Sequence, residues 1–141
     1  MEKDIVERQK AELEVHQKWM KEALKLADRA AAIGEIPVGA LVVLNNEVIE
    51  EGWNQSIVNH DPSAHAEMIA IRAAAKRVGN YRVVEADLYV TLEPCPMCAG
   101  ALVHSRVARV FYGAPDYKTG AAGSVMNLLQ HANLNHQTDV I

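Results

Sequence analysis

Four side chains have the types and the spacing of a catalytic zinc site: His65, Glu67, Cys95 and Cys98. Cys95 and Cys98 are three positions apart, so one helical turn presents both sulfurs on the same side, and His65 can supply a third ligand. Structural zinc uses four protein ligands, whereas catalytic zinc uses three and keeps one position open. The chain has no other cysteine. The set therefore predicts one catalytic zinc ion per chain.

Glu67 follows His65 by two positions, where a helix turns its side chain away from that ligand and toward the open position. A carboxylate there can take a proton from zinc-bound water, whose pKa the metal lowers to about 7, and can return protons to a leaving group. Each residue alone has a plainer interpretation: a core or capping histidine, a solvated first-turn carboxylate, a redox dithiol. A redox dithiol explains neither the two prolines around Cys95 nor the preceding His-x-Glu. We therefore interpret the set as a site that activates water.

Both motifs are expected at helix N-termini. A helix-start signal at residues 61–63 directly precedes His65, and Pro94 and Pro96 introduce a short helix around Cys95. The helix macrodipole is positive at this end, which favours thiolates. The two motifs should therefore meet where two helices begin.

The remaining hydrophobic pattern predicts the elements that position these helices. In chain order they are a helix from about residue 7 or earlier to 32, strands over 38–44 and 47–53 joined by a tight turn at Asn45-Asn46, a helix that ends before Gly79, a strand over 88–92, a short helix to about 104 and a strand over 108–112. This order predicts an α/β fold, a three-layer α-β-α domain with a mixed central sheet. In such folds the sites lie at the carboxyl ends of strands.

The composition is that of one compact domain: 141 residues, 50% hydrophobic and 23% charged. The longest uncharged apolar run is about six residues, against the roughly 20 that a membrane helix needs, and the charged residues after Met1 are unlike a signal peptide. We therefore expect a cytoplasmic protein with no membrane partner. The formal net charge of -4 is not that of a basic nucleic-acid-binding domain, so any such contact must be local.

Further stretches accompany the two motifs: Glu35–Ala40, Gly52–Asn54, Asp61-Pro62, Tyr89–Gly100, His104–Arg106 and Gly113–Asp116. From Trp19 onward, nearly all of the chain resembles the bacterial tRNA-specific adenosine deaminases, which belong to the cytidine/deoxycytidylate deaminase superfamily. His-x-Glu with Pro-Cys-x-x-Cys indicates only a zinc deaminase. The loop from Lys118 to Ser124 and the pair Asn135-His136 favour the tRNA enzymes over guanine, cytosine or nucleoside deaminases.

The resemblance implies a cytidine deaminase-like fold and the zinc-dependent hydrolysis of adenosine to inosine at the wobble position of a tRNA anticodon. His65, Cys95 and Cys98 would hold the zinc ion. Glu67 would move protons from water to the adenine ring and then to the departing amine.

The resemblance also implies substrate contacts and partners. The expected substrate-binding residues are Asn54, the backbone N–H of Ala66, Asp116 and Lys118. The expected partners are the tRNA anticodon stem-loop and a second copy of the chain. A homodimer is also favoured by the small residues of the helix from Cys98 to Val103, which suit close packing.

We predict two parts in the chain. Residues 1-17 are expected to form a solvated helical extension, and residues 18-141 the zinc-dependent deaminase domain. Family members continue past the position of Ile141 into a further helix with aromatic and basic residues. We therefore expect this domain to be C-terminally truncated relative to the family, with fewer rings to stack on RNA bases.

Two other functions stay open at this point. The net charge favours a free nucleobase or nucleoside deaminase of the guanine or cytosine type. A catalytically inactive RNA-binding subunit is the other alternative, and Glu67 argues against it. RNA is favoured if the basic residues gather on one face: Arg72, Lys76, Arg77, Arg82, Arg106, Arg109 and Lys118.

Acceptance of DNA depends on Asp116. Its carboxylate could accept a hydrogen bond from a ribose 2′-hydroxyl, which DNA lacks, and so favour RNA. It could instead close an ordinary turn by accepting from its own backbone. The sequence leaves both interpretations open.

Overall fold

The computed structural model describes residues 2–130, 139 and 140. Its elements are α1 (Glu2–Ala32), β1 (Gly39–Leu44), β2 (Glu47–Trp53), α2 (Ala66–Val78), β3 (Asp87–Leu92), α3 (Pro96–Ser105), β4 (Arg109–Ala114) and β5 (Asp139–Val140). The strands form one sheet in the order β2-β1-β3-β4-β5. β1 is antiparallel to β2 and β3, and β4 is parallel to β3 and β5. The predicted mixed sheet is confirmed.

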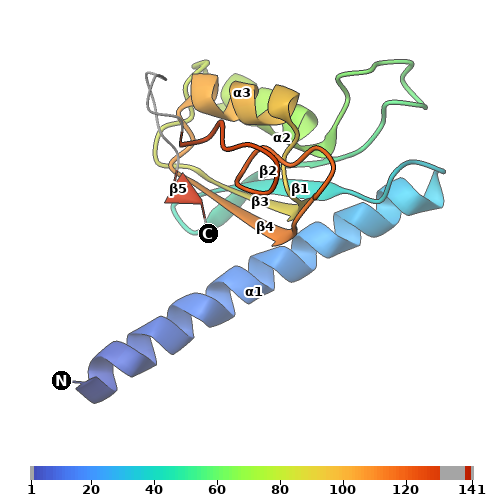
Figure 1. Ribbon diagram of the computed structural model, residues 1–141. Helices are drawn as coiled ribbons and strands as arrows, with labels where there is room; N and C mark the ends of the chain where they lie inside the picture. The colour runs from blue at the N-terminus through green and yellow to red at the C-terminus, as the bar shows by residue number, and fades with distance from the viewer. Residues whose placement is uncertain (1, 131–138, 141) are drawn as a thin grey trace.

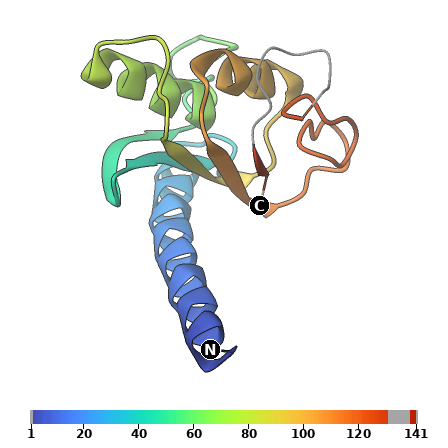
Figure 2. The same ribbon diagram turned by 90° about the vertical axis from the view of Figure 1, so that its left-hand side faces the viewer.

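The sheet is the middle of three layers (Figure 1). α2 and α3 cover one face and α1 covers the other, as the rotated view also shows (Figure 2). Because successive side chains of a strand point to opposite faces, Val42 and Leu88 pack in the core under α2 and α3, while Leu41 and Tyr89 pack under α1. The predicted α-β-α architecture is therefore confirmed, and the central strands β1 and β3 are apolar because both of their faces are covered.

Only the second half of α1 packs against the sheet. Its buried residues are Trp19, Ala23, Leu26, Ala27 and Ala30. The first half is exposed up to residue 15 and extends past the body of the molecule (Figure 1). The helix begins at Glu2, in agreement with the predicted start at about Glu7 or earlier, and runs unbroken through residue 17. The division into an extension of residues 1-17 and a domain of residues 18-141 stays a prediction.

The hairpin of β1 and β2 brings one side of the site into place. Its turn residues Asn45 and Asn46 have φ of 52° and 62°, the left-handed values that a tight hairpin turn requires. Near the end of β2, a Cβ on Gly52 would lie 2.4 Å from the carbonyl oxygen of Ala66. Only glycine permits this approach, so α2 begins directly against the end of β2.

Two further observations complete the fold. β5 is a two-residue strand that no sequence pattern predicted, because so short an element has no periodicity. Within the described part of the chain, no helix combines the length and the apolar character needed to cross a membrane.

Candidate active site

The site lies where α2 and α3 begin, beyond the carboxyl end of β3. His65 is the N-cap residue of α2 and Cys95 is the N-cap residue of α3. Neither side chain makes a capping hydrogen bond to its own helix, so both are available to face each other. Pro96 occupies the first turn of α3, where a missing N–H costs nothing because that group has no partner within the helix.

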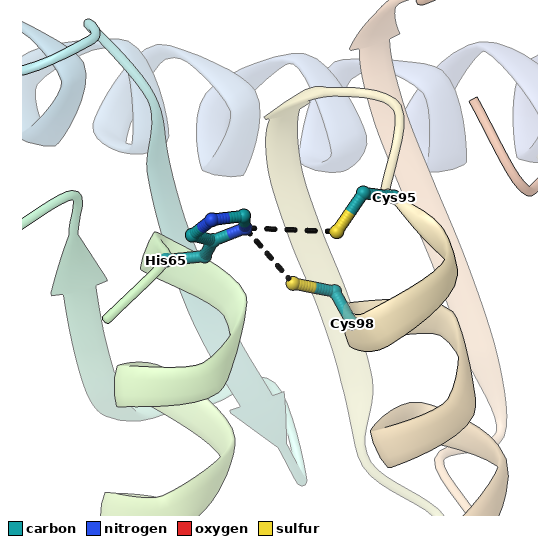
Figure 3. A group of neighbouring side chains, drawn as sticks. All are labelled: His65, Cys95 and Cys98. Carbon is teal, nitrogen blue, oxygen red and sulfur yellow. Dashed lines mark hydrogen bonds between the residues drawn. The ribbon is translucent and has the colours of Figure 1, made fainter. Parts of the chain in front are cut away.

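The three predicted metal ligands converge (Figure 3). Nδ1 of His65 lies 3.6 Å from Sγ of Cys95 and 3.5 Å from Sγ of Cys98. The three ligand atoms lie within 4.8 Å of one another. Bonds of about 2.1 Å to nitrogen and 2.3 Å to sulfur at a tetrahedral angle separate such atoms by about 3.6 Å. The donor set therefore fits a zinc ion in both chemistry and spacing.

The two sulfurs differ in their electrostatics. A hydrogen bond from the Cys98 thiol lowers the pKa of Cys95 to about 5. The same hydrogen bond, together with burial, raises the pKa of Cys98. One sulfur is thus ready as a thiolate at neutral pH, and the other releases its proton when a cation binds.

Glu67 is buried beside this set, with 4% of its surface exposed. Burial raises the pKa of Glu67 to about 7. Its carboxyl group is also close enough to Cys98 for a hydrogen bond between the two side chains. A carboxyl group with a pKa near 7 can both accept and return a proton at neutral pH, which is the behaviour of a general acid and base.

A pocket connects these groups to solvent. Its lining includes His65, Glu67 and Cys95, together with Asn54 and Asp116. Ile36, Val38 and Leu92 supply apolar surface, and Glu93 and Thr119 complete the lining. The pocket therefore combines an apolar wall with polar groups that converge on the metal ligands, as a small planar substrate requires.

Asn54 and Ala66, two of the predicted substrate contacts, bond to each other. The backbone N–H of Ala66 donates to Oδ1 of Asn54 over 2.8 Å. This N–H is therefore used within the protein, whereas the Asn54 amide NH₂ makes no hydrogen bond among the described residues, and Asn54 lines the pocket. The contact of Ala66 with a base stays a prediction.

Asp116 and Lys118 are placed differently from each other. Asp116 is half-buried and lines the pocket, but its carboxylate accepts hydrogen bonds from the backbone N–H groups of Lys118 and Thr119 and from the Thr119 hydroxyl. Lys118 is exposed and is not part of the lining. The turn interpretation of Asp116 therefore has direct geometric support. The pair Asn135-His136 lies outside the described residues.

Two carboxylates near the pocket, Glu35 and Glu93, are buried, and the sequence did not indicate a role for either of them. Glu35 accepts from the backbone N–H groups of Ile57 and Val58 over 2.7 and 2.8 Å. Glu93 accepts from the loop that follows β4. Both belong to stretches that carried the resemblance, but a glutamate beside a turn looks the same in sequence whether it is solvated or buried.

Residues 13–114 match the family model of the cytidine and deoxycytidylate deaminase zinc-binding region. The chain belongs to this family. The deaminase is 54% identical over 132 residues to the tRNA-specific adenosine deaminase of Haemophilus influenzae, an alignment that covers 93% of this chain and 76% of that enzyme. Family membership and the donor set agree that the deaminase uses zinc.

Two solved structures share the fold of the deaminase. One comes from a study of A-to-I editing by tRNA:A34 deaminases at the wobble position of transfer RNA; it has a TM-score of 0.85 and 41% identity, covering 89% of this chain and 91% of that one. The other is the guanine deaminase of Bacillus subtilis, with a TM-score of 0.69 and 42% identity, covering 71% of this chain and 64% of that one. The similarity to the tRNA enzyme thus extends over more of both chains.

Proposed function

We propose that the deaminase converts adenosine to inosine at the wobble position of a tRNA anticodon. The observation that carries the proposal is the 54% identity, over 93% of the chain, to a tRNA-specific adenosine deaminase. The pocket supports it, because His65, Glu67 and Cys95 line it and the buried Cys98 lies within ligand distance of His65 and Cys95. The reaction consumes one water and releases one ammonia per adenosine.

The residues of the pocket divide the work. His65, Cys95 and Cys98 would hold zinc, which when bound would supply a Lewis acid that lowers the pKa of water to near neutrality. Glu67 takes one proton from the water that attacks C6 of the adenine and passes it to ring N1, then takes the second proton from the hydroxyl now on C6 and gives it to the departing amine, which leaves as ammonia. The free amide NH₂ of Asn54 donates to an acceptor on the base edge. The apolar side chains of Val38 and Leu92 cover the ring.

The surface around the pocket favours a nucleic-acid substrate. Tyr117, next to Asp116, is 80% exposed, so its ring is available to stack on an unpaired base. Lys118 is exposed beside it and can contact a phosphate. Arg77 and Arg109 pair with Glu50 and Asp87 and are therefore less available for such contacts.

The test is a comparison of ammonia release from four substrates. These are an anticodon stem-loop with a wobble adenosine, free adenosine, guanine and cytidine. The proposal expects turnover of the stem-loop only. Turnover of free guanine, which the similarity to a guanine deaminase makes the main alternative, would overturn it. No turnover of any substrate by the zinc-loaded protein would favour the inactive RNA-binding subunit.

We also propose that the deaminase forms a homodimer through α3. Gly100, which has no side chain, and Ala101 leave the partly exposed face of this helix without bulky groups, and Ala101 lines an apolar groove with Met68 and Tyr81. Small residues permit close helix packing. Sedimentation at micromolar concentration should show a dimer, and Ala101→Glu should yield monomers. A stable monomer of the unaltered protein would refute the proposal.

A further inference from the structure

Glu93 is a buried charged residue that the proposed mechanism does not use. It directly follows β3 and has 2% of its surface exposed, the smallest exposure of any charged side chain among the described residues. A carboxylate taken out of water is costly unless hydrogen-bond donors replace the water. The hydrogen-bond donors around Glu93 therefore show which part of the chain this buried carboxylate holds in place.

All four donors come from one segment, residues 115–124, which we call the wall loop. Oε1 of Glu93 accepts from the backbone N–H of Asp116 over 3.1 Å and from the hydroxyl of Ser124. Oε2 accepts from the backbone N–H groups of Ala122 and Ser124 over 3.0 and 3.1 Å. A carboxylate offers about four acceptor sites. The wall loop uses all of them.

The wall loop also passes close to the carboxylate itself. A Cβ on Gly120 would lie 2.4 Å from Oε2 of Glu93 and 2.4 Å from the carbonyl oxygen of Asp116. Next to it, the N–H of Ala121 donates to the carbonyl oxygen of Pro94 over 2.8 Å. The loop therefore rests on Glu93 and Pro94, the two residues that directly precede a zinc ligand.

This arrangement connects the wall loop to the active site. Asp116 and Thr119 of the wall loop line the same pocket as Cys95 and Glu67. The segment from Glu93 to Cys98 thus contains two zinc ligands, Cys95 and Cys98, and it also contacts the wall loop through Glu93 and Pro94. A shift of the loop relative to Glu93 is a shift of the pocket wall relative to the metal ligands.

We propose that Glu93 is a positioning residue, whose carboxylate sets the place of the wall loop as the substrate-binding wall of the pocket. The inference rests on the proposed function for the identity of the substrate, but not for the position of the loop. Glu93 contributes to the lining of the pocket, but its carboxylate oxygens bond to the wall loop and not to the metal ligands, so its loss should weaken substrate binding and leave the chemistry of bound substrate largely intact.

Glu93→Gln tests this with a side chain of the same size. Gln offers one oxygen acceptor and one NH₂ donor, so an NH₂ group must face part of a ring of donors. The Ser124 hydroxyl can rotate to accept from the NH₂, but the backbone N–H groups cannot. At least one backbone N–H of the wall loop therefore loses its partner, whichever way the amide turns.

The first measurement is amide hydrogen exchange in peptides covering residues 115–126 of the zinc-loaded protein. We expect exchange there to speed up about tenfold in Glu93→Gln, the effect of one lost buried hydrogen bond. The second measurement is steady-state kinetics on the stem-loop RNA. We expect KM to rise about tenfold, kcat to stay within about threefold and zinc content to remain one per chain.

Asp87→Asn is the matched control, because it also neutralises a carboxylate on or beside β3 but at the opposite end. Asp87 pairs with Arg109 through contacts of 3.0 and 2.7 Å, far from the wall loop. It should lower the melting temperature without changing KM or the exchange of residues 115–126. If Glu93→Gln does not fold, Ser124→Ala removes a single hydrogen bond and should change exchange and KM in the same direction by about threefold.

The outcomes separate the possibilities. Unchanged exchange in residues 115–126 of the altered proteins would overturn the inference. So would a fall in kcat at constant KM, which marks an effect on the chemical step, or a loss of zinc, which marks a disturbed ligand set. If the unaltered protein deaminates no RNA, the proposed function fails, while the exchange data still decide whether Glu93 positions the loop.

Discussion

The two sides of the pocket are built in contrasting ways. On the metal side, His65 and Cys95 are N-cap residues of helices that rest on a fully covered sheet. On the substrate side, the walls are irregular segments, each fastened by one buried carboxylate. The contrast suggests a division of labour. Atoms that react are fixed by packed elements, whereas atoms that recognise substrate lie on loops whose position can be tuned.

Glu35 provides a second example of a buried carboxylate that holds a loop beside the pocket. It is buried, and it holds the backbone at Ile57 and Val58. The segment at Ile57 and Val58 follows Asn54, which is a predicted contact to the base. In the same way, the wall loop contains Asp116, another predicted substrate contact. Each segment is therefore held by a buried carboxylate that accepts hydrogen bonds from backbone N–H groups of the segment. Substitutions on the metal side should remove catalysis, while substitutions on the loops should change which substrate binds and how tightly.

The largest effect is expected for Glu67→Ala. The substitution removes the group that moves protons but none of the three metal ligands. Turnover should fall about 10⁴-fold, the upper end for general acid and base catalysis, because the residue serves several proton transfers. Zinc content and folding should be unchanged, as metal analysis and circular dichroism would show. Activity within tenfold of the unaltered protein would contradict this role.

A loss of metal is expected for Cys98→Ser. Serine keeps the size of the side chain but offers a hydroxyl in place of a thiolate, which is a much weaker zinc ligand. Zinc affinity should drop about a hundredfold or more, and activity should return only in excess zinc. Competition with a chelator measures the affinity. Glu67→Ala is the control, since it should be inactive but keep its full zinc content. A full equivalent of tightly held zinc in Cys98→Ser would show that the ligand assignment is wrong.

Most of the metal side could be predicted from the sequence, because its signals are local. Proline, histidine and cysteine at fixed offsets indicate a helix start that carries ligands, and Asn45-Asn46 indicates the hairpin turn. Spacing alone cannot place His65 within reach of both sulfurs. That contact depends on how α2 and α3 pack on the sheet, and on the room that Gly52 leaves for α2.

The loop side could not be predicted in the same way. The bonds of Glu93 join residues separated by 23 to 31 positions, so no local pattern contains them. The pairing of Asn54 with Ala66 is also non-local, and it leaves the Asn54 amide NH₂ rather than the Ala66 N–H facing the pocket.

Asp116 had two interpretations from the sequence: a residue that accepts a hydrogen bond from ribose, or a residue that only closes a turn. Its Oδ1 accepts from the N–H groups of Lys118 and Thr119 over 2.9 and 3.1 Å, and its Oδ2 accepts from the Thr119 hydroxyl over 2.9 Å. Hydrogen bonds from the backbone of Lys118 and Thr119 hold the pKa of Asp116 below its ordinary value, so the group is charged at neutral pH. Of about four acceptor sites, one on Oδ2 is left for a ligand.

The smallest effect is therefore expected for Asp116→Asn, measured as the ratio of RNA to DNA turnover on matched hairpins. A ribose 2′-hydroxyl can donate to the remaining Oδ2 site, whereas DNA brings only phosphate charge near the carboxylate. Asn keeps the Oδ1 acceptor that closes the turn and removes the charge, so the ratio should narrow about tenfold. Lys118→Gln is the matched control, because loss of a phosphate contact should weaken both substrates equally. If the ratio in Asp116→Asn equals that of the unaltered protein, Asp116 serves only the turn, and discrimination against DNA must come from another part of the loop side.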